Sequence, residues 1–200
     1  MSRGLLLVVS GPSGAGKGTI CKEILSRRPE IGLSVSATTR KPREGEIDGK
    51  SYFFLEEDTF RRMIDKGEFI EWACFCQNYY GTPKKAVEEQ LEAGRDVILE
   101  IEVQGAAQVR SKFPEAVFIF VLPPSFEELR NRIMGRGTEA PEVIEERMTR
   151  AKKEVEHIGK YNYIVLNDTV ERATDRLAAI IDAEKLRIER SDDVIKQFTE

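Results

Sequence analysis

The chain has 200 residues, of which 40% are hydrophobic and 33% are charged, and its formal net charge at pH 7 is −4. This composition excludes collagen-like, low-complexity and broadly disordered chains, and the length predicts one compact domain with room for inserted lobes. The mildly negative net charge argues against a protein that coats nucleic acid non-specifically.

The cysteines and the single histidine give no sign of a disulfide framework or a metal centre. Cys21, Cys74 and Cys76 cannot pair completely, and their spacing is not that of a zinc site. His157 lies in a charged stretch and is expected to be solvated. The opening apolar run, Leu5–Val9, is too short for a signal-peptide core, and no segment approaches a membrane span. We therefore expect a cytoplasmic protein with reduced thiols and no membrane contact.

Four continuous apolar runs, each followed by a helical pattern, predict the strands of a central sheet. They are Leu5–Ser10, Val97–Ile101, Ala116–Leu122 and Tyr163–Leu166. Runs without polar alternation are typical of strands buried on both faces. Because strands alternate with helices, we predict an α/β fold with a P-loop-type parallel sheet flanked by helices.

Helix signals follow in chain order. The sequence predicts a helix from about Lys17 to Arg28 and a shorter one over Glu57–Lys66. Thr82 is predicted to cap the next helix, with Pro83 at its first position and Gly94 at its end.

Later helices show capping and periodicity. Ser125 and Glu128 have the spacing of a capping box. Two apolar stripes at helical spacing predict helices packed on the core: Ile144, Met148, Ala151, Val155 and Ile158, then Val170, Ala173, Leu177 and Ile180.

Residues from 34 to about 80 break the alternation of strands and helices. Apart from one short helix, this stretch carries only short β-type pieces, Ser51–Leu55 and Phe69–Phe75. We interpret it as an inserted lobe. Gly135 and Gly137, in an arginine-rich stretch, predict a hinge.

The turn after the first run reads GPSGAGKGT, which is the pattern of a phosphate-binding loop. Its predicted nucleotide-binding residues are Gly11, Pro12, Ser13, Gly14, Ala15, Gly16, Lys17, Gly18 and Thr19. Glycines let backbone N–H groups turn inward around an anion, and the helix that follows adds its positive end. Lys17 supplies a charge to the β- and γ-phosphates. An ordinary glycine-rich turn is the alternative.

The position after Lys17 departs from the usual pattern. A serine or threonine hydroxyl commonly contacts Mg²⁺ there, whereas this chain has Gly18 followed by Thr19. Contact through Thr19 and contact through water both stay open.

A second anion site is predicted in the segment SATTRKPR, residues 36–43. Arg40 and Arg43 flank a rigid proline, and guanidinium groups bind phosphate through paired hydrogen bonds. Tyr52 and Tyr80 would add hydroxyl donors, which makes a pocket for one monophosphate. A solvated basic loop is the alternative, since charged runs commonly lie on the surface.

Six segments in order resemble the guanylate kinase family. They read GPSGAGKGT, SATTRKPREGEIDGKSYFF, GEFIEWACFCQNYYGTP, ILEIEVQGA, RIMGRGTEAPEVIEERM and YIVLND. The resemblance covers about Leu5 to Ile188 and implies a P-loop core with an inserted nucleoside-monophosphate lobe and a small lid. The implied parts are a core of about 1–33, 83–125 and 159–190, a GMP-binding lobe of about 34–82 and a lid of about 126–158.

The resemblance also assigns roles in the lobe. The implied GMP-binding residues are Ser36, Arg40, Arg43, Tyr52, Glu71, Tyr80, Gly81, Thr82 and Glu102. The arginines and tyrosines would hold the phosphate, and the carboxylates would face guanine with the two hydroxyls nearby. A carboxylate accepts from both N1–H and N2–H of guanine, whereas adenine presents a lone pair at N1. The family more often has Asp where this chain has Glu102, so the extra methylene displaces that carboxylate.

The implied catalytic residues are Lys17, Arg132, Arg136 and Arg147. In the family, such arginines close over the transferring phosphoryl group, offset the charge on its oxygens and exclude water. Arg130 and Arg150 are expected to be surface residues. Glu100 and Thr19 are the metal-ligand candidates, and Asn167 is a candidate adenine contact.

The implied reaction is Mg²⁺-dependent phosphoryl transfer from ATP to GMP, with these two nucleotides as partners and the oligomeric state open. Two alternatives remain. Another nucleoside-monophosphate kinase, such as an adenylate kinase, is disfavoured by Glu71 and by Tyr79–Gly81. A non-catalytic, peptide-binding relative is disfavoured because the chain keeps Lys17, Arg136 and Arg147.

Overall fold

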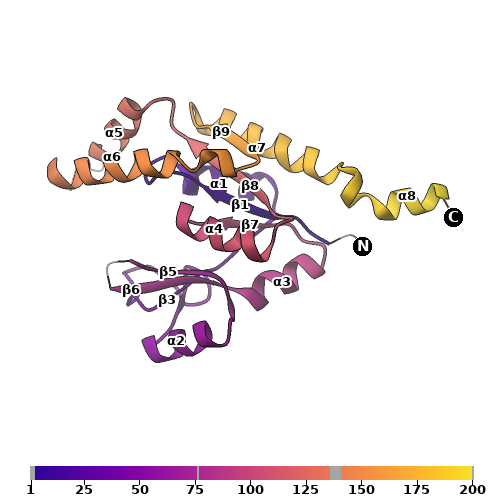
Figure 1. Ribbon diagram of the computed structural model, residues 1–200, viewed down its shortest axis with the longest axis horizontal. Helices are drawn as coiled ribbons and strands as arrows, with labels where there is room; N and C mark the ends of the chain where they lie inside the picture. The colour runs from indigo at the N-terminus through magenta and orange to yellow at the C-terminus, as the bar shows by residue number, and fades with distance from the viewer. Residues whose placement is uncertain (1–2, 76, 136–140, 200) are drawn as a thin grey trace.

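The structure is a computed structural model that describes residues 3–75, 77–135 and 141–199, so Cys76, Arg136 and Gly137 of the predicted hinge lie outside the described residues. Its centre is a parallel five-stranded sheet with the order β2-β7-β1-β8-β9 (Figure 1). The strands are β1 (Leu6–Ser10), β2 (Gly32–Leu33), β7 (Val97–Glu100), β8 (Val117–Leu122) and β9 (Tyr163–Leu166). The predicted α/β fold with a parallel sheet is confirmed.

Helices cover both faces of this sheet, with α1 and α7 on one face and α3 and α4 on the other. The helices are α1 (Lys17–Arg27), α3 (Lys84–Glu92), α4 (Val103–Lys112), α5 (Phe126–Met134), α6 (Pro141–Val155), α7 (Val170–Lys185) and α8 (Asp192–Thr199). Short 3₁₀ helices lie at Ile158–Lys160 and Ile188–Arg190.

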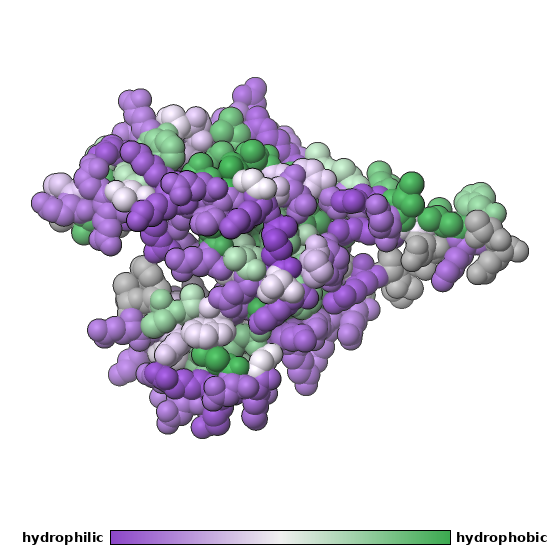
Figure 2. Space-filling model, in the orientation of Figure 1, coloured by the Kyte–Doolittle hydropathy of each residue, from purple (hydrophilic) through white to green (hydrophobic). Residues whose placement is uncertain are grey.

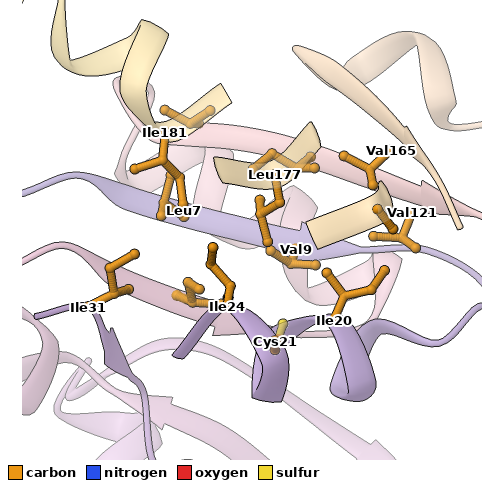
Figure 3. Close-up of a cluster of buried hydrophobic side chains, with 14 of the residues drawn as sticks. Leu7, Val9, Ile20, Cys21, Ile24, Ile31, Val121, Val165, Leu177 and Ile181 are labelled. Carbon is orange, nitrogen blue, oxygen red and sulfur yellow. The ribbon is translucent and has the colours of Figure 1, made fainter. Parts of the chain in front are cut away.

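The central strand β1 shows how the core is built. All of its residues are buried, and successive side chains point to opposite faces. Leu7 and Val9 pack with residues of α1 and α7 in the cluster drawn in Figure 3. Leu6 and Val8 belong to the second cluster, with α3 and α4. Burial on both faces explains why this run has no polar alternation.

Two strands differ from the sequence prediction. β2 has only two residues, which is too short for a periodic signal. In β9 only Val165 is buried, whereas Ile164 and Leu166 are 56% and 39% exposed. Because β9 is the last strand of the sheet, α7 covers one of its faces and leaves the other open, so the prediction of burial on both faces is wrong.

A second sheet, with the order β4-β3-β6-β5, lies below the first in Figure 1. Its elements are β3 (Ala37–Thr38), β4 (Phe53–Phe54), β5 (Phe69–Phe75) and β6 (Asn78–Pro83), with helix α2 (Glu57–Asp65). Phe60 of α2 stacks on Phe69 of β5 with ring centroids 4.3 Å apart, and both are buried beside Ala37. This separate aromatic core supports the interpretation of the stretch as an inserted lobe.

The start of α3 differs from the predicted cap. Thr82 lies within β6, and its buried hydroxyl donates to Glu71 instead of capping the helix. The helix begins at Lys84, after Pro83. Its end is as predicted, since Gly94 follows with a left-handed φ of 77°.

At α5 the predicted N-cap is confirmed. The Ser125 hydroxyl oxygen accepts from the backbone N–H of Glu128 at 3.0 Å. The Glu128 side chain does not complete a capping box, because its carboxylate accepts instead from Nε of Arg132 at 2.8 Å.

The C-terminal helix α8 extends away from the body of the molecule (Figure 1). Apolar side chains, among them Leu186, Ile188 and Phe198, are exposed along this end of the chain, as Figure 2 shows. Among the described residues, no helix combines the length and the hydrophobicity needed to cross a membrane.

Candidate active site

The glycine loop between β1 and α1 lies at the carboxyl edge of the parallel sheet. Gly11 and Gly16 have φ values of 145° and 92°, which residues with a side chain rarely adopt. A Cβ on Gly11 would lie 2.2 Å from the carbonyl oxygen of Val121. A Cβ on Gly16 would lie 2.2 Å from Nδ2 of Asn167. The loop therefore keeps this path only with glycine at both positions.

Lys17 lies across the loop. Its side chain is buried, and its ammonium donates to the carbonyl oxygens of Gly11 at 2.7 Å and Pro12 at 3.2 Å. The backbone N–H of Ala15 donates to the Pro12 carbonyl at 3.0 Å and tightens the turn. Since α1 begins at Lys17, the positive end of that helix also faces the loop.

Helices α5 and α6 and the turn after β9 contact the same loop. The buried Asn167 donates through Nδ2 to the carbonyl oxygen of Ala15 at 2.8 Å. Arg132 of α5 donates to the Asn167 carbonyl at 3.0 Å. Arg147 of α6 donates to the hydroxyl of Ser13 at 2.8 Å. The structure thus brings Arg132, Arg147 and Asn167 onto the phosphate loop.

A carboxylate lies beside the loop at the end of β7. The side-chain oxygens of Glu100 lie 3.4 Å from the point that a Cβ on Gly18 would occupy. Glu100 is open to solvent, but the protein around it partly desolvates the carboxyl group and raises its pKa. The charge of Lys17 opposes this shift, and that of Glu102 adds to it. Thr19 is exposed on the first turn of α1.

This arrangement fits the chemistry of Mg²⁺. The ion prefers oxygen ligands and is commonly held by one or two carboxylates together with substrate phosphates. Glu100 places such a group beside the loop. Within 3–75, 77–135 and 141–199, no group of three or more His, Cys, Asp or Glu side chains could hold a metal. A metal at Glu100 would therefore share its ligands with a bound nucleotide.

The second sheet carries a basic and aromatic cluster. Arg40, with 15% of its side chain exposed, donates through Nη2 to both carboxylate oxygens of Glu46, at 2.8 and 3.0 Å. Its guanidinium lies 5.5 Å from the ring centre of Tyr52, and that ring lies 6.2 Å from the ring of Tyr80. Hydrogen bonds from Arg40 and from the Arg43 backbone lower the pKa of Glu46. The solvated-loop alternative therefore describes the exposed Arg43 but not Arg40.

Glu71 of β5 is the buried carboxylate of the site. It is 7% exposed, and its Oε1 accepts from the Thr82 hydroxyl at 2.7 Å. Desolvation raises its pKa, and the hydrogen bonds from Thr82 oppose that shift. A further neighbour, which no sequence motif indicates, is Gly105 of α4, where a Cβ would lie 2.7 Å from Oε2 of Glu71. The lone glycine in a helical pattern is the signal that points to such a close approach.

The remaining lobe residues lie on the neighbouring strands. Gly81 of β6 is buried and pairs with Ala37 of β3 and Trp72 of β5. Ser36 is half-buried directly before β3. Gly81 therefore lies in the same sheet as Glu71, and Ser36 lies at the start of a strand of that sheet.

Glu102 differs from Glu71 in its surroundings. It stands directly before α4, its side chain is 51% exposed, and its Oε2 accepts from Nη2 of Arg150 at 3.2 Å. Arg150 is thus more than the solvated surface residue that the sequence predicts, because it bonds to a candidate site residue. Arg130 forms an exposed ion pair with Glu145, as expected of the surface.

A phosphate loop at the carboxyl edge of a parallel sheet, with a basic and aromatic cluster on a second sheet, defines a P-loop nucleotide-binding protein. The family model described as Guanylate kinase matches residues 3–184. The chain is 56% identical to a guanylate kinase of Caldanaerobacter subterraneus over 99% of this chain and 96% of that protein. It is 55% identical to a guanylate kinase of Clostridioides difficile over 98% and 95%, respectively. The crystal structure of guanylate kinase from Anaplasma phagocytophilum matches with a TM-score of 0.77 at 35% identity, covering 95% of this chain and 90% of that one. The chain belongs to the guanylate kinase family.

Proposed function

We propose that this protein transfers the γ-phosphoryl group of ATP to GMP, giving ADP and GDP, in purine nucleotide metabolism. The observation that carries the proposal is the buried Glu71 with the Thr82 hydroxyl bonded to it. Guanine offers N1–H and N2–H donors along one edge, so an ionised carboxylate pairs with both. Adenine presents a lone pair at N1, so the same carboxylate would stay unpaired and reject it.

Two separate anion sites suit two nucleotides. Lys17 and the glycine loop would hold the β- and γ-phosphates of ATP. Arg40, Tyr52 and Tyr80, with Arg43 beside them, would hold the GMP phosphate. Binding of GMP phosphate would draw Arg40 away from its internal carboxylate partner, Glu46. Asn167, next to the loop, is proposed to contact adenine.

Positioning and fixed charge supply the catalysis. The acceptor is already a phosphate anion at pH 7, so no general base is needed. Charge accumulates on the oxygens of the transferring group, and Lys17, Arg132 and Arg147, which hydrogen-bond to the loop or to Asn167 beside it, would offset it. The family resemblance adds Arg136 to this set.

Glu100 would hold Mg²⁺ beside the loop, with Thr19 as the second candidate. When bound, the ion would neutralise charge on the β- and γ-phosphates. The charge of Lys17 lowers the pKa of Glu100 and so favours the ionised carboxylate that would hold the ion.

The proposed division of the chain keeps 34–82 as the GMP-binding lobe and 126–158 as the lid. The second sheet and its own core support the lobe, and the contacts of α5 and α6 with the loop support the lid. A cytoplasmic location is proposed because Cys21 and Cys74 are free thiols.

A coupled assay of ADP release tests the proposal. ATP and Mg²⁺ are supplied with GMP, AMP, CMP or UMP in separate reactions. Turnover with GMP alone is the expected result. Turnover with AMP would remove Glu71 as the base reader, and no turnover by folded protein would favour a peptide-binding relative that lacks catalysis.

A further inference from the structure

A chain of charged side chains joins α6 to the start of α4, which are neighbouring helices in Figure 1. Arg150 of α6 donates through Nη2 to Oε2 of Glu102 at 3.2 Å and through Nε to Oε1 of Glu154 at 2.9 Å. Glu154 is buried, whereas Glu102 is half exposed beside the nucleotide site. These hydrogen-bonded side chains therefore connect the interior of the lid to a candidate guanine-reading carboxylate.

Acidic side chains surround Arg150. Desolvation raises the pKa of Glu154, and the charge of Glu102 raises it further. Lys17 is committed to the carbonyl oxygens of the glycine loop. Arg150 is therefore the cation that bonds directly to both Glu102 and Glu154. Its loss would leave Glu102 and Glu154 without the cation that joins them.

Glu102 also needs a partner to hold one orientation. Its side chain is long, exposed and placed directly before α4, where helix packing does not fix it. Arg150 reaches it from a helix that is itself anchored, because Met148 and Ala151 of α6 are buried against α5. An anchored guanidinium can thus fix a carboxylate that its own backbone leaves free.

We propose that Arg150 is a positioning residue for guanine recognition, which holds the Glu102 carboxylate at the edge of the GMP site. The inference rests on the proposed function, since it concerns the same base-reading site. Arg150 acts through Glu102, so the two side chains behave as one unit toward GMP. The phosphate loop binds ATP independently of this pair.

The test compares KM and kcat for GMP and for ATP in the wild type, Arg150→Met, Glu102→Gln and the double variant. Arg130→Met is the matched control, because Arg130 forms a similarly exposed ion pair, but with Glu145 in place of a candidate site residue. We expect Arg150→Met and Glu102→Gln each to raise the KM for GMP about three- to fivefold, with no further rise in the double variant. The KM for ATP and both constants of Arg130→Met stay within about twofold of the wild type. Arg150→Lys, which keeps the charge and a donor, recovers part of the loss.

Several outcomes would overturn the inference. One is an unchanged KM for GMP in Arg150→Met when Glu102→Gln raises it. Another is a double variant whose loss is the product of the two single losses. A third is a parallel rise of both KM values, which would make Arg150 a support for α6 only. If the wild type itself fails to phosphorylate GMP, the proposed function fails and the inference with it. An active wild type beside an unaffected Arg150→Met removes the inference alone.

Discussion

At the scale of single residues, Glu71 meets two opposed demands. The proposed recognition of guanine requires an ionised carboxylate, whereas burial raises the pKa of Glu71 and favours its neutral form. Glutamine keeps the shape of the side chain but loses the charge and presents donors toward the donors of guanine. We expect Glu71→Gln to raise the KM for GMP on the order of 10²-fold, with the KM for ATP nearly unchanged. Equal losses for both nucleotides, measured by initial rates, would make Glu71 structural.

The same residue predicts how stability depends on pH. Because the pKa of Glu71 is raised in the folded protein, its contribution to stability is fully present below the ordinary value of 4.5 and is lost as pH rises through the folded pKa. The Tm of Glu71→Gln, measured by calorimetry without nucleotides, should therefore gain on the wild type as pH rises from about 4.5 toward neutrality. A difference in Tm that does not change with pH would contradict this.

At Gly16, both a neighbouring side chain and the left-handed backbone angle exclude any residue with a Cβ. Gly45 is the matched comparison, since its φ of 82° is also left-handed but no atom lies within 4 Å of a Cβ there. Gly45→Ala should cost about 1 kcal/mol of unfolding free energy from backbone strain alone. Gly16→Ala adds a clash with Asn167, so we expect a larger loss in urea unfolding together with weaker ATP binding. Equal losses would mean that the loop tolerates the side chain.

At the scale of elements, the sequence predicts those strands and helix ends that depend on neighbouring residues along the chain. Apolar runs predicted the central strands, and the Ser125 hydroxyl caps α5 as its position indicates. The predictions were wrong where the structure depends on residues far away in the sequence. The Thr82 hydroxyl is taken by Glu71 from the paired strand, and the position of β9 at the sheet edge exposes one of its faces. Arg150 was missed as a site neighbour for the same reason, because its contact comes from another helix.

The cap of α5 is a testable local signal. Ser125→Ala removes the acceptor of the Glu128 N–H, which should lower the unfolding free energy by about 1 kcal/mol in urea titration. Ser111→Ala is the control, because that hydroxyl donates to the carbonyl of Gln108 within α4 and caps no helix N-terminus. If Ser111→Ala lowers the unfolding free energy as much as Ser125→Ala, the loss at Ser125 does not come from its role as the N-cap.

At the scale of the whole molecule, one end of the central sheet carries the candidate site and the other end carries contacts that stabilise the fold. The phosphate loop, Glu100 and Asn167 lie at the carboxyl ends of the strands, where the proposed chemistry occurs. At the opposite end, the buried Asp96 accepts from the backbone N–H of Leu5 at 2.9 Å and pairs with Lys185 of α7 at 2.6 Å. Asp96 thus joins two strands and a helix far from the nucleotide site.

Paired substitutions at the two ends test this division. Asp96→Ala leaves the Leu5 N–H without its acceptor and should cost about 1–3 kcal/mol of unfolding free energy, with kcat and both KM values unchanged. Lys17→Ala should keep the fold but lower the rate by on the order of 10³-fold, since the proposed function places this cation beside the transferring phosphoryl group. Urea unfolding and initial rates on both variants separate the two effects. A rate loss in Asp96→Ala at a temperature where it is fully folded would show that the ends are coupled through β1 and β7.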